Sequence, residues 1–183
     1  MLWGDSLVQA DEPALAQLLR VYERTGASVL GVKRVPADQV EHYGIVDGEP
    51  VDDRTFRVHA IVEKPAVGAA PSNLAQVKGC VLTNRLMQLL RETPPRHGGE
   101  IWLVDVIHAL LAEEPVYAHL LAGLHADTGN PLEWIQANVD FALRRDDVGP
   151  ALRTYLLGLV ASWGGDCNAG ARDPAPAADL GTQ

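Results

Sequence analysis

The segment Val58–Pro65 places the strongest constraint on the fold of this chain. Its β-branched residues Val58, Ile61 and Val62 predict a buried strand. Pro65 cannot donate to a sheet ladder, so the strand ends before it. Glu63 and Lys64 therefore lie at the carboxyl end of the strand, where open α/β sheets bind ligands. From this segment alone, a surface ion pair and a ligand site both remain open.

Strand-like and helix-like segments alternate along the chain, which predicts the α/β class with a mostly parallel sheet. Asp47-Gly48 indicates a turn, and the hairpin Tyr43–Glu63 around it forms an antiparallel insertion. We expect one strand to end near residue 4 and further strands over 28–35, 43–46, 56–63, 74–82 and 116–121. We expect helices over 13–25, 83–92, 100 to about 114 and 147–159, and one that begins at residue 131.

Helical periodicity predicts which apolar residues face the core. In the first helix these residues are Leu15, Leu18, Leu19 and Tyr22. The third helix is expected to bury Ile101, Leu103, Val104, Ile107, Leu110 and Leu111, and the fourth Leu132, Ile135, Val139 and Phe141. Residues 162–183 show almost no such periodicity, so we expect one domain over 1–161 followed by a disordered tail.

Composition excludes several classes of protein. A net charge of −9 and a pI near 5.0 argue against binding to nucleic acid or to an anionic membrane. The two cysteines, Cys80 and Cys167, do not form a disulfide framework or a metal-ligand cluster. Because Met1–Ala10 has no signal-peptide pattern and no segment reaches membrane-spanning length, we expect a cytoplasmic protein.

Three acids are predicted at strand ends: Asp5, Glu63 and Asp127. If the sheet topology brings these ends to one edge, two carboxylates there suit Mg²⁺, which prefers hard oxygen ligands. A cap or turn role is the alternative, and Asp127-Thr128-Gly129 is also typical of an Asx-turn. The sequence contains no phosphate-binding glycine loop, nucleophile elbow or zinc motif. The kind of catalysis left open uses a metal ion and the alignment of substrates.

Six motifs, taken in order, resemble one family over residues 1–159. They are Gly4-Asp5, Tyr43-Gly44-Ile45-Val46, Val62-Glu63-Lys64-Pro65, Pro71-Ser72-Asn73-Leu74-Ala75, Gly99-Glu100-Ile101 and Asp127-Thr128-Gly129-Asn130. Their order and spacing resemble the bacterial UTP–glucose-1-phosphate uridylyltransferases, or UDP-glucose pyrophosphorylases. The resemblance implies an incomplete, Rossmann-like nucleotidyltransferase sheet of three layers, with a β-hairpin insertion and C-terminal helices.

The family reaction joins UTP and glucose 1-phosphate to give UDP-glucose and pyrophosphate with Mg²⁺. The sugar phosphate attacks the α-phosphorus in line, so alignment and charge neutralisation matter most. By resemblance, Asp5 and Asp127 hold the Mg²⁺, which makes Asp5 a catalytic residue together with Lys64. Lys64 meets the sugar phosphate as a compact charge.

The resemblance also implies three substrate-binding residues besides Lys64. Glu63 accepts hydrogen bonds from glucose hydroxyls, because a carboxylate accepts strongly from two neighbouring hydroxyls. Gly44 lets the sugar approach the backbone, which a Cβ would obstruct. Asn73 belongs to the same predicted sugar-binding set.

The sequence departs from the family pattern at several points. The family's glycine-rich nucleotide-binding segment lies upstream of the motif Gly4-Asp5, so we expect this chain to be truncated and to carry mainly the sugar-phosphate half of the site. Ser6 replaces an acid that is usual in the family. Lys78-Gly79-Cys80 alters the wall of the sugar pocket, and Trp102 and Val104 replace polar residues.

Without the upstream strands, the apolar faces near Val29, Leu30, Val62 and Val81 are expected to be exposed. Such patches are usually interfaces or aggregation liabilities, so we expect either a homo-oligomer or a truncated chain of low stability. Two alternatives to a uridylyltransferase remain: a non-catalytic module that binds a sugar phosphate or regulates a partner, and an α/β domain whose charged strand ends are structural.

Overall fold

The computed structural model describes residues 1–2, 4–96 and 98–165. The chain divides into two compact units, Met1–Ile135 and a second unit that begins at Gln136. In chain order the elements are β1 (Ser6–Gln9), α1 (Ala14–Thr25), β2 (Ser28–Arg34), the 3-10 helix η1 (Ala37–His42), β3 (Gly44–Pro50), β4 (Thr55–Glu63), β5 (Leu74–Val81), α2 (Asn84–Glu92), α3 (Leu103–Leu111), β6 (Val116–Leu120), β7 (Leu124–Asp127), α4 (Pro131–Leu143) and α5 (Gly149–Gly165).

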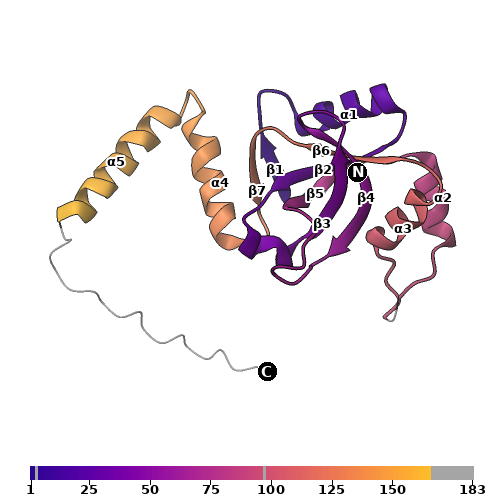
Figure 1. Ribbon diagram of the computed structural model, residues 1–183. Coiled ribbons are helices and arrows are strands. Elements are labelled where there is room, and N and C mark those ends of the chain that lie inside the picture. Colours follow the sequence, from indigo (N-terminus) through magenta and orange to yellow (C-terminus); the bar gives the residue numbers. More distant parts are fainter. Residues whose placement is uncertain (3, 97, 166–183) are drawn as a thin grey trace. The chain divides into compact units, whose positions relative to one another are not determined.

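Five strands of the first unit close into a ring in the order β2-β5-β3-β4-β6 (Figure 1). The β3–β4 hairpin closes the ring, because β3 pairs with β5 and β4 pairs with β6. Strands β1 and β7 form a separate antiparallel ribbon. The α/β class predicted from the sequence is confirmed.

The expectation of a mostly parallel sheet is wrong. Among the described strands only β2 and β6 pair in parallel. The chain that joins β2 to β6 runs from η1 through α3, and parallel neighbours need a long crossover of this kind. Short connections produce antiparallel neighbours instead, as in the β3–β4 hairpin.

Asp47-Gly48, predicted as a turn, lies inside strand β3. The register of β3 against β4 shifts between these two residues, which marks a β-bulge. A Cβ on Gly48 would lie 2.5 Å from the carbonyl oxygen of Arg57, so only glycine fits this close approach. The true turn comes later, where the Asp52 carboxylate accepts from the backbone N–H groups of Arg54 and Thr55 at 2.9 and 2.7 Å.

The ring of strands has a separate apolar cluster on each covered face. Leu30 packs in a large cluster with residues of α2 and α3, including Leu86 and Ile107. Val29 packs under α1 against Leu18. Val29 and Leu30, which were expected to be exposed, are therefore fully buried, whereas Val62 is 39% exposed.

Helix α1 confirms only half of the predicted face: Leu18 is fully buried and Tyr22 packs against the same cluster, whereas Leu15 and Leu19 do not face the core. Leu18 and Val21 lie in the core, together with the side chain of Gln17. Leu15 and Leu19 are exposed by 38% and 39%. Gln17 is tolerated inside because its amide donates to the carbonyl oxygens of Glu12 and Ala122, and accepts from the N–H of Ala122.

Helix α3 begins later than predicted, and two strands were missed. Residues Glu100 and Ile101 lie before the helix, so Ile101 is 42% exposed rather than part of its buried face. Asp5, predicted to end a strand, instead precedes β1. Strand β7 occupies a stretch in which the sequence indicated only turns. A strand this short is stable only when it pairs with β1, so its own residues did not indicate it.

The helices near the carboxyl end expose apolar side chains. Leu132, Ile135 and Phe141 of α4 were predicted to face inward, but are exposed by 63%, 54% and 37%. Helix α5 extends to Gly165, so residues 162–165 are helical rather than disordered as predicted. The remainder of the predicted tail lies outside the described residues, and the domain limit at residue 161 stays a prediction. Over the described residues, no helix has the length and apolarity needed to cross a membrane.

Adjacent leucines of α1 test how the first unit is stabilised. We expect Leu18→Ala to lower the free energy of unfolding by about 2–5 kcal/mol, because it leaves a cavity under the sheet. Leu19→Ala, the matched control on the same helix, should cost about 1 kcal/mol or less. Urea denaturation followed by circular dichroism measures both, and equal losses would contradict the observed face of α1.

Candidate functional site

One cavity of about 430 Å³ gathers most of the residues singled out from the sequence. It is bordered by the β1–β7 ribbon, by β2 and β5, by the open end of the β3–β4 hairpin and by the start of α3. The lining residues are Ser6, Lys33, His42, Tyr43, Gly44, Glu63, Lys64, Gln76, Val77, Leu103, His125, Ala126 and Asp127.

The open end of the hairpin supplies Gly44, Glu63 and Lys64. Gly44 pairs directly with Glu63 across the two strands, and the Lys64 N–H donates to the Tyr43 carbonyl oxygen at 3.0 Å. A Cβ on Gly44 would lie 3.0 Å from Oε2 of Glu63. Because position 44 has no side chain, the Glu63 carboxylate has room to lie beside the backbone there.

Lys64 adopts a conformation that is rare for a residue with a side chain. Its φ of 46° lies in the left-handed region, and no other non-glycine residue described by the structure has a positive φ. Strain of this kind gathers at functional sites. Here the left-handed conformation lets the chain turn sharply between β4 and Pro65 while Lys64 still lines the cavity.

The β1–β7 ribbon brings Asp5 and Asp127 together. Ser6 pairs with Asp127, and the Asp5 carbonyl oxygen accepts from the N–H of Thr128 at 2.8 Å. The Asx-turn considered above is present, because the Gly129 N–H donates to Oδ1 of Asp127 at 3.0 Å. Asp127 lines the cavity, whereas Asp5 lies beside it.

Both carboxylates border Gly129. A Cβ on that glycine would lie 3.1 Å from Oδ1 of Asp127 and 3.9 Å from Oδ2 of Asp5. Two carboxylates around one small residue make an oxygen-rich set that suits a hard divalent cation such as Mg²⁺. No group of three or more His, Cys, Asp and Glu side chains in the described part of the chain gathers as a metal site. The residues present thus fit a cation that takes its other ligands from substrate or water.

Lys33 and His125 were missed from the sequence and line the same cavity. Lys33 Nζ lies 4.8 Å from the centre of the Tyr43 ring, a distance typical of a cation–π contact. Burial lowers the pKa of His125, and the charge of Lys33 lowers it further. The available signal was the pair Lys33-Arg34, two charges inside a largely apolar predicted strand.

Asn73 is not among the residues that line this cavity. Its side-chain oxygen accepts from Nη1 of Arg34 at 2.8 Å, and its backbone oxygen accepts from Val35. The structure therefore brings together Gly44, Glu63, Lys64 and Asp127, with Asp5 adjacent. The role given to Asn73 stays a prediction.

Lysines and carboxylates that line one cavity of an α/β domain suit a ligand with both phosphate and hydroxyl groups, as in the α/β proteins that handle phosphates or sugars. The family model described as nucleotidyl transferase matches residues 1–143. The chain belongs to this family.

Relatives of known activity narrow the resemblance. The chain is 41% identical over 159 residues to UTP–glucose-1-phosphate uridylyltransferase 1 of Staphylococcus saprophyticus, and 37% identical over 160 residues to the Bacillus subtilis UTP–glucose-1-phosphate uridylyltransferase. Each match covers 87% of this chain and 55% of the relative. The family resemblance seen in the motifs is confirmed, and the chain spans about half the length of these relatives.

Solved structures agree with these relatives. The UDP-glucose pyrophosphorylase from Acinetobacter baumannii superimposes with a TM-score of 0.79 at 34% identity, over 86% of this chain and 55% of that protein. A UDP-glucose pyrophosphorylase complexed with UDP-glucose gives a TM-score of 0.72 at 27% identity, over 79% of this chain and 56% of the other.

The backbone of Lys64 offers a test of stored strain. We expect Lys64→Gly to leave the free energy of unfolding unchanged or to raise it by up to about 1 kcal/mol, because glycine adopts a positive φ freely. Lys33→Gly, the matched control in regular strand β2, should lower it by about 1 kcal/mol. Urea denaturation compares the two, and a Lys64→Gly loss as large as that of the control contradicts the strain.

Proposed function

We propose that this chain provides the sugar-phosphate half of a uridylyltransferase site, which converts UTP and glucose 1-phosphate to UDP-glucose and pyrophosphate. The convergence of Gly44, Glu63, Lys64 and Asp127 on one cavity carries the proposal. Relatives named for this reaction support the choice of substrates. We place the activity in the cytoplasm, which suits a chain with two cysteines and no disulfide framework.

Glu63 and Gly44 recognise the sugar in this proposal. The Glu63 carboxylate accepts from two glucose hydroxyls, and charge-assisted bonds of this kind are stronger than neutral ones. Gly44 has no side chain to occupy the space beside Oε2 of Glu63. A hydroxyl can therefore approach both the carboxylate and the hairpin backbone.

Lys64 neutralises the phosphate of the sugar substrate. Its compact ammonium group sits at the strained end of β4, next in sequence to the sugar-binding carboxylate. Lys33 adds a second positive charge in the same cavity. Holding an anionic nucleophile in line with a second anionic substrate requires this compensation of charge.

Asp5 and Asp127 are the residues that would hold Mg²⁺. When bound there, the cation supplies charge neutralisation to the phosphates of the reacting substrates. The Asx-turn fixes one oxygen of Asp127, and the paired β1 and β7 backbones fix the spacing of the two acids.

A non-catalytic sugar-phosphate-binding module is the second candidate. It draws support from the fact that the chain spans about half of each relative that it matches. The residues assigned above serve both candidates in binding glucose 1-phosphate, so turnover distinguishes the two.

Binding of glucose 1-phosphate tests both candidates. By calorimetry, Lys64→Met should weaken binding about 10- to 100-fold, the usual worth of a charged hydrogen bond. Glu63→Gln should weaken glucose 1-phosphate similarly but leave inorganic phosphate unchanged, because Glu63 contacts only the sugar. Glu49→Gln is the matched control, since Glu49 is an exposed acid in the same hairpin.

Release of pyrophosphate from UTP and glucose 1-phosphate with Mg²⁺ then separates the candidates. Turnover that Asp127→Asn abolishes supports the transferase. Binding without turnover supports the module. A chain that neither binds glucose 1-phosphate nor turns over overturns both.

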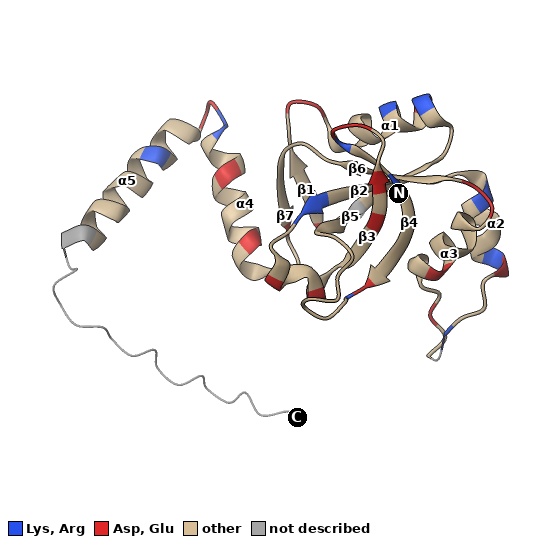
Figure 2. Cartoon of the chain, viewed as in Figure 1, with Lys and Arg blue, Asp and Glu red and all other residues tan. Residues whose placement is uncertain are grey.

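We further propose that the chain forms a homo-oligomer through α5. This helix carries a single charged residue, Arg153, and is almost entirely uncharged along its length (Figure 2). Four large apolar side chains of this helix are about 60% exposed: Tyr155 (63%), Leu157 (66%), Val160 (59%) and Trp163 (63%). Exposed apolar side chains gathered on one helix are typical of interfaces.

Light scattering over a range of concentrations tests the oligomer. We expect a mass of at least twice the 19.7 kDa of one chain. Leu157→Glu should shift the protein towards the monomer, because a charge cannot be buried unpaired in an apolar contact. Thr154→Glu, the matched control on the same helix, should not. A monomer at every concentration excludes the oligomer.

A further inference from the structure

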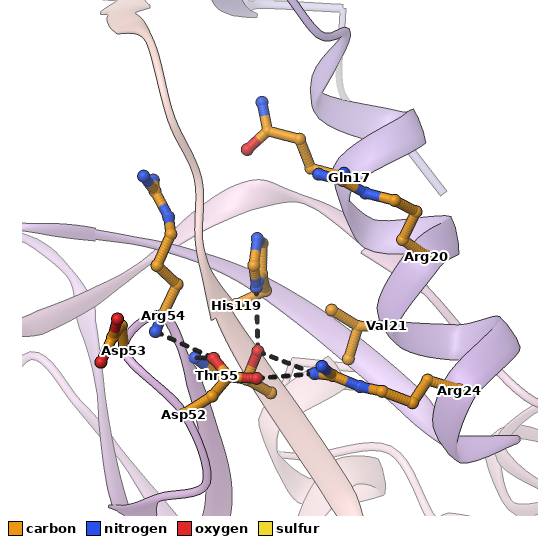
Figure 3. Close-up of a pocket in the computed structure, with 9 residues that line it drawn as sticks. All are labelled: Gln17, Arg20, Val21, Arg24, Asp52, Asp53, Arg54, Thr55 and His119. Atoms are coloured by element: carbon orange, nitrogen blue, oxygen red, sulfur yellow. Dashed lines mark hydrogen bonds and ion pairs between the residues drawn. The ribbon is translucent and has the colours of Figure 1, made fainter.

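A second and larger cavity, of about 700 Å³, lies at the closed end of the β3–β4 hairpin (Figure 3). Three elements border it: helix α1, the turn before β4, and strand β6. Its lining residues are Gln17, Arg20, Val21, Arg24, Asp52, Asp53, Arg54, Thr55 and His119. None of them lines the cavity described above, and nothing in the proposed transferase reaction uses them.

The back of the cavity is a buried polar pair. Thr55 and His119 are exposed by only 1% and 8%, and Oγ1 of Thr55 lies 3.2 Å from Nδ1 of His119. The other ring nitrogen of His119 points away from Thr55, into the space between Arg54 and Gln17 (Figure 3). When the Thr55 hydroxyl donates to Nδ1, the proton of the neutral ring is on Nε2, which then faces the cavity as a donor.

Arg54 forms one wall and is held rigidly. Its Nε and Nη2 both donate to the carbonyl oxygen of Leu120, at 2.8 and 2.6 Å. Its backbone N–H donates to Asp52. A carbonyl oxygen is neutral, so these side-chain contacts orient the guanidinium without cancelling its charge. The Arg54 guanidinium is thus a positive charge that is already oriented on this wall.

Helix α1 presents two more arginines on the opposite wall. Arg20 pairs with Glu12, and Nη2 of Arg24 pairs with Asp52 at 2.8 Å. The Arg20 and Arg24 side chains are 65% and 56% exposed. Exposed ion pairs are worth about 1 kcal/mol or less, so a more highly charged anion can replace the carboxylate partners.

We propose that this cavity binds the phosphoryl group of a small anionic metabolite, held by Arg54, Arg20 and Nε2 of His119. Arg54 lines the cavity from the turn, Arg20 from α1 and His119 from β6. A tetrahedral group with several oxygens offers acceptors on more sides than a planar carboxylate with two. Guanidinium groups bind phosphate through paired, charge-assisted bonds. The chain's net charge of −9 disfavours a polyanion, so the ligand is a small molecule.

The charge on His119 couples binding to pH. Burial lowers the pKa of His119, and Arg54 lowers it further, while Asp52 opposes them. A bound dianion stabilises the protonated ring and raises this pKa. Affinity therefore increases as the pH falls. The charged side chains that face His119 from the turn and from α1 are Asp52, Asp53, Arg54, Arg20 and Arg24.

Inorganic sulfate is a suitable probe, because its charge stays constant between pH 5.5 and 8 while that of phosphate changes. Sulfate is titrated into the full chain and its binding is measured by calorimetry, with chloride at equal ionic strength as the reference. In every chain that keeps His119, the ring is also followed by NMR. Wild type should bind severalfold more tightly at pH 5.5 than at pH 7.5. His119→Gln keeps an N–H donor but cannot titrate, so its binding should lose this dependence.

Variants of the two walls locate the site. Arg54→Gln should weaken sulfate about tenfold, and Arg20→Gln, which leaves the strand contacts intact, about threefold. Lys64→Met, the control in the other cavity, should leave the His119 response unchanged. The proposal is overturned if sulfate shifts His119 no more than chloride does, if both arginine variants bind like wild type, or if only Lys64→Met alters the response.

Discussion

The pairing of β3 with β4 is the constraint on which both cavities depend. Its register places Gly44 opposite Glu63 at one end, and the Asp52 turn and Thr55 at the other. The bulge at Gly48 absorbs one extra residue between these ends. Because β3 also pairs with β5 and β4 with β6, the same hairpin closes the ring of strands.

The charged residues of the candidate site lie on backbone that is hydrogen-bonded within the fold. Glu63 ends a nine-residue strand, Lys64 is tied to Tyr43 through its N–H, and Asp127 ends β7 within an Asx-turn. Each side chain thus projects from a backbone whose hydrogen bonds are already made. A site that works without an enzyme nucleophile depends on such preorganisation, because its catalysis comes from aligning the substrates and neutralising their charge.

The β1–β7 ribbon shows how a site can depend on a minor element. Each strand has four residues, too short to be stable without its partner. Their pairing joins Asp5 to Thr128, residues 123 apart in sequence. The proposed cation site thus exists only in the folded chain.

Local chemistry in the sequence determined the end of β4 before Pro65, the Asx-turn at Asp127, the α/β class and the family. These depend on the residues themselves and on their order. Tertiary structure alone decided that Asp47-Gly48 is a bulge, that α1 buries Gln17 rather than Leu19, and that Lys33 and His125 join the site. Strand register and helix orientation follow from partners distant in sequence, whose pairing no local pattern encodes.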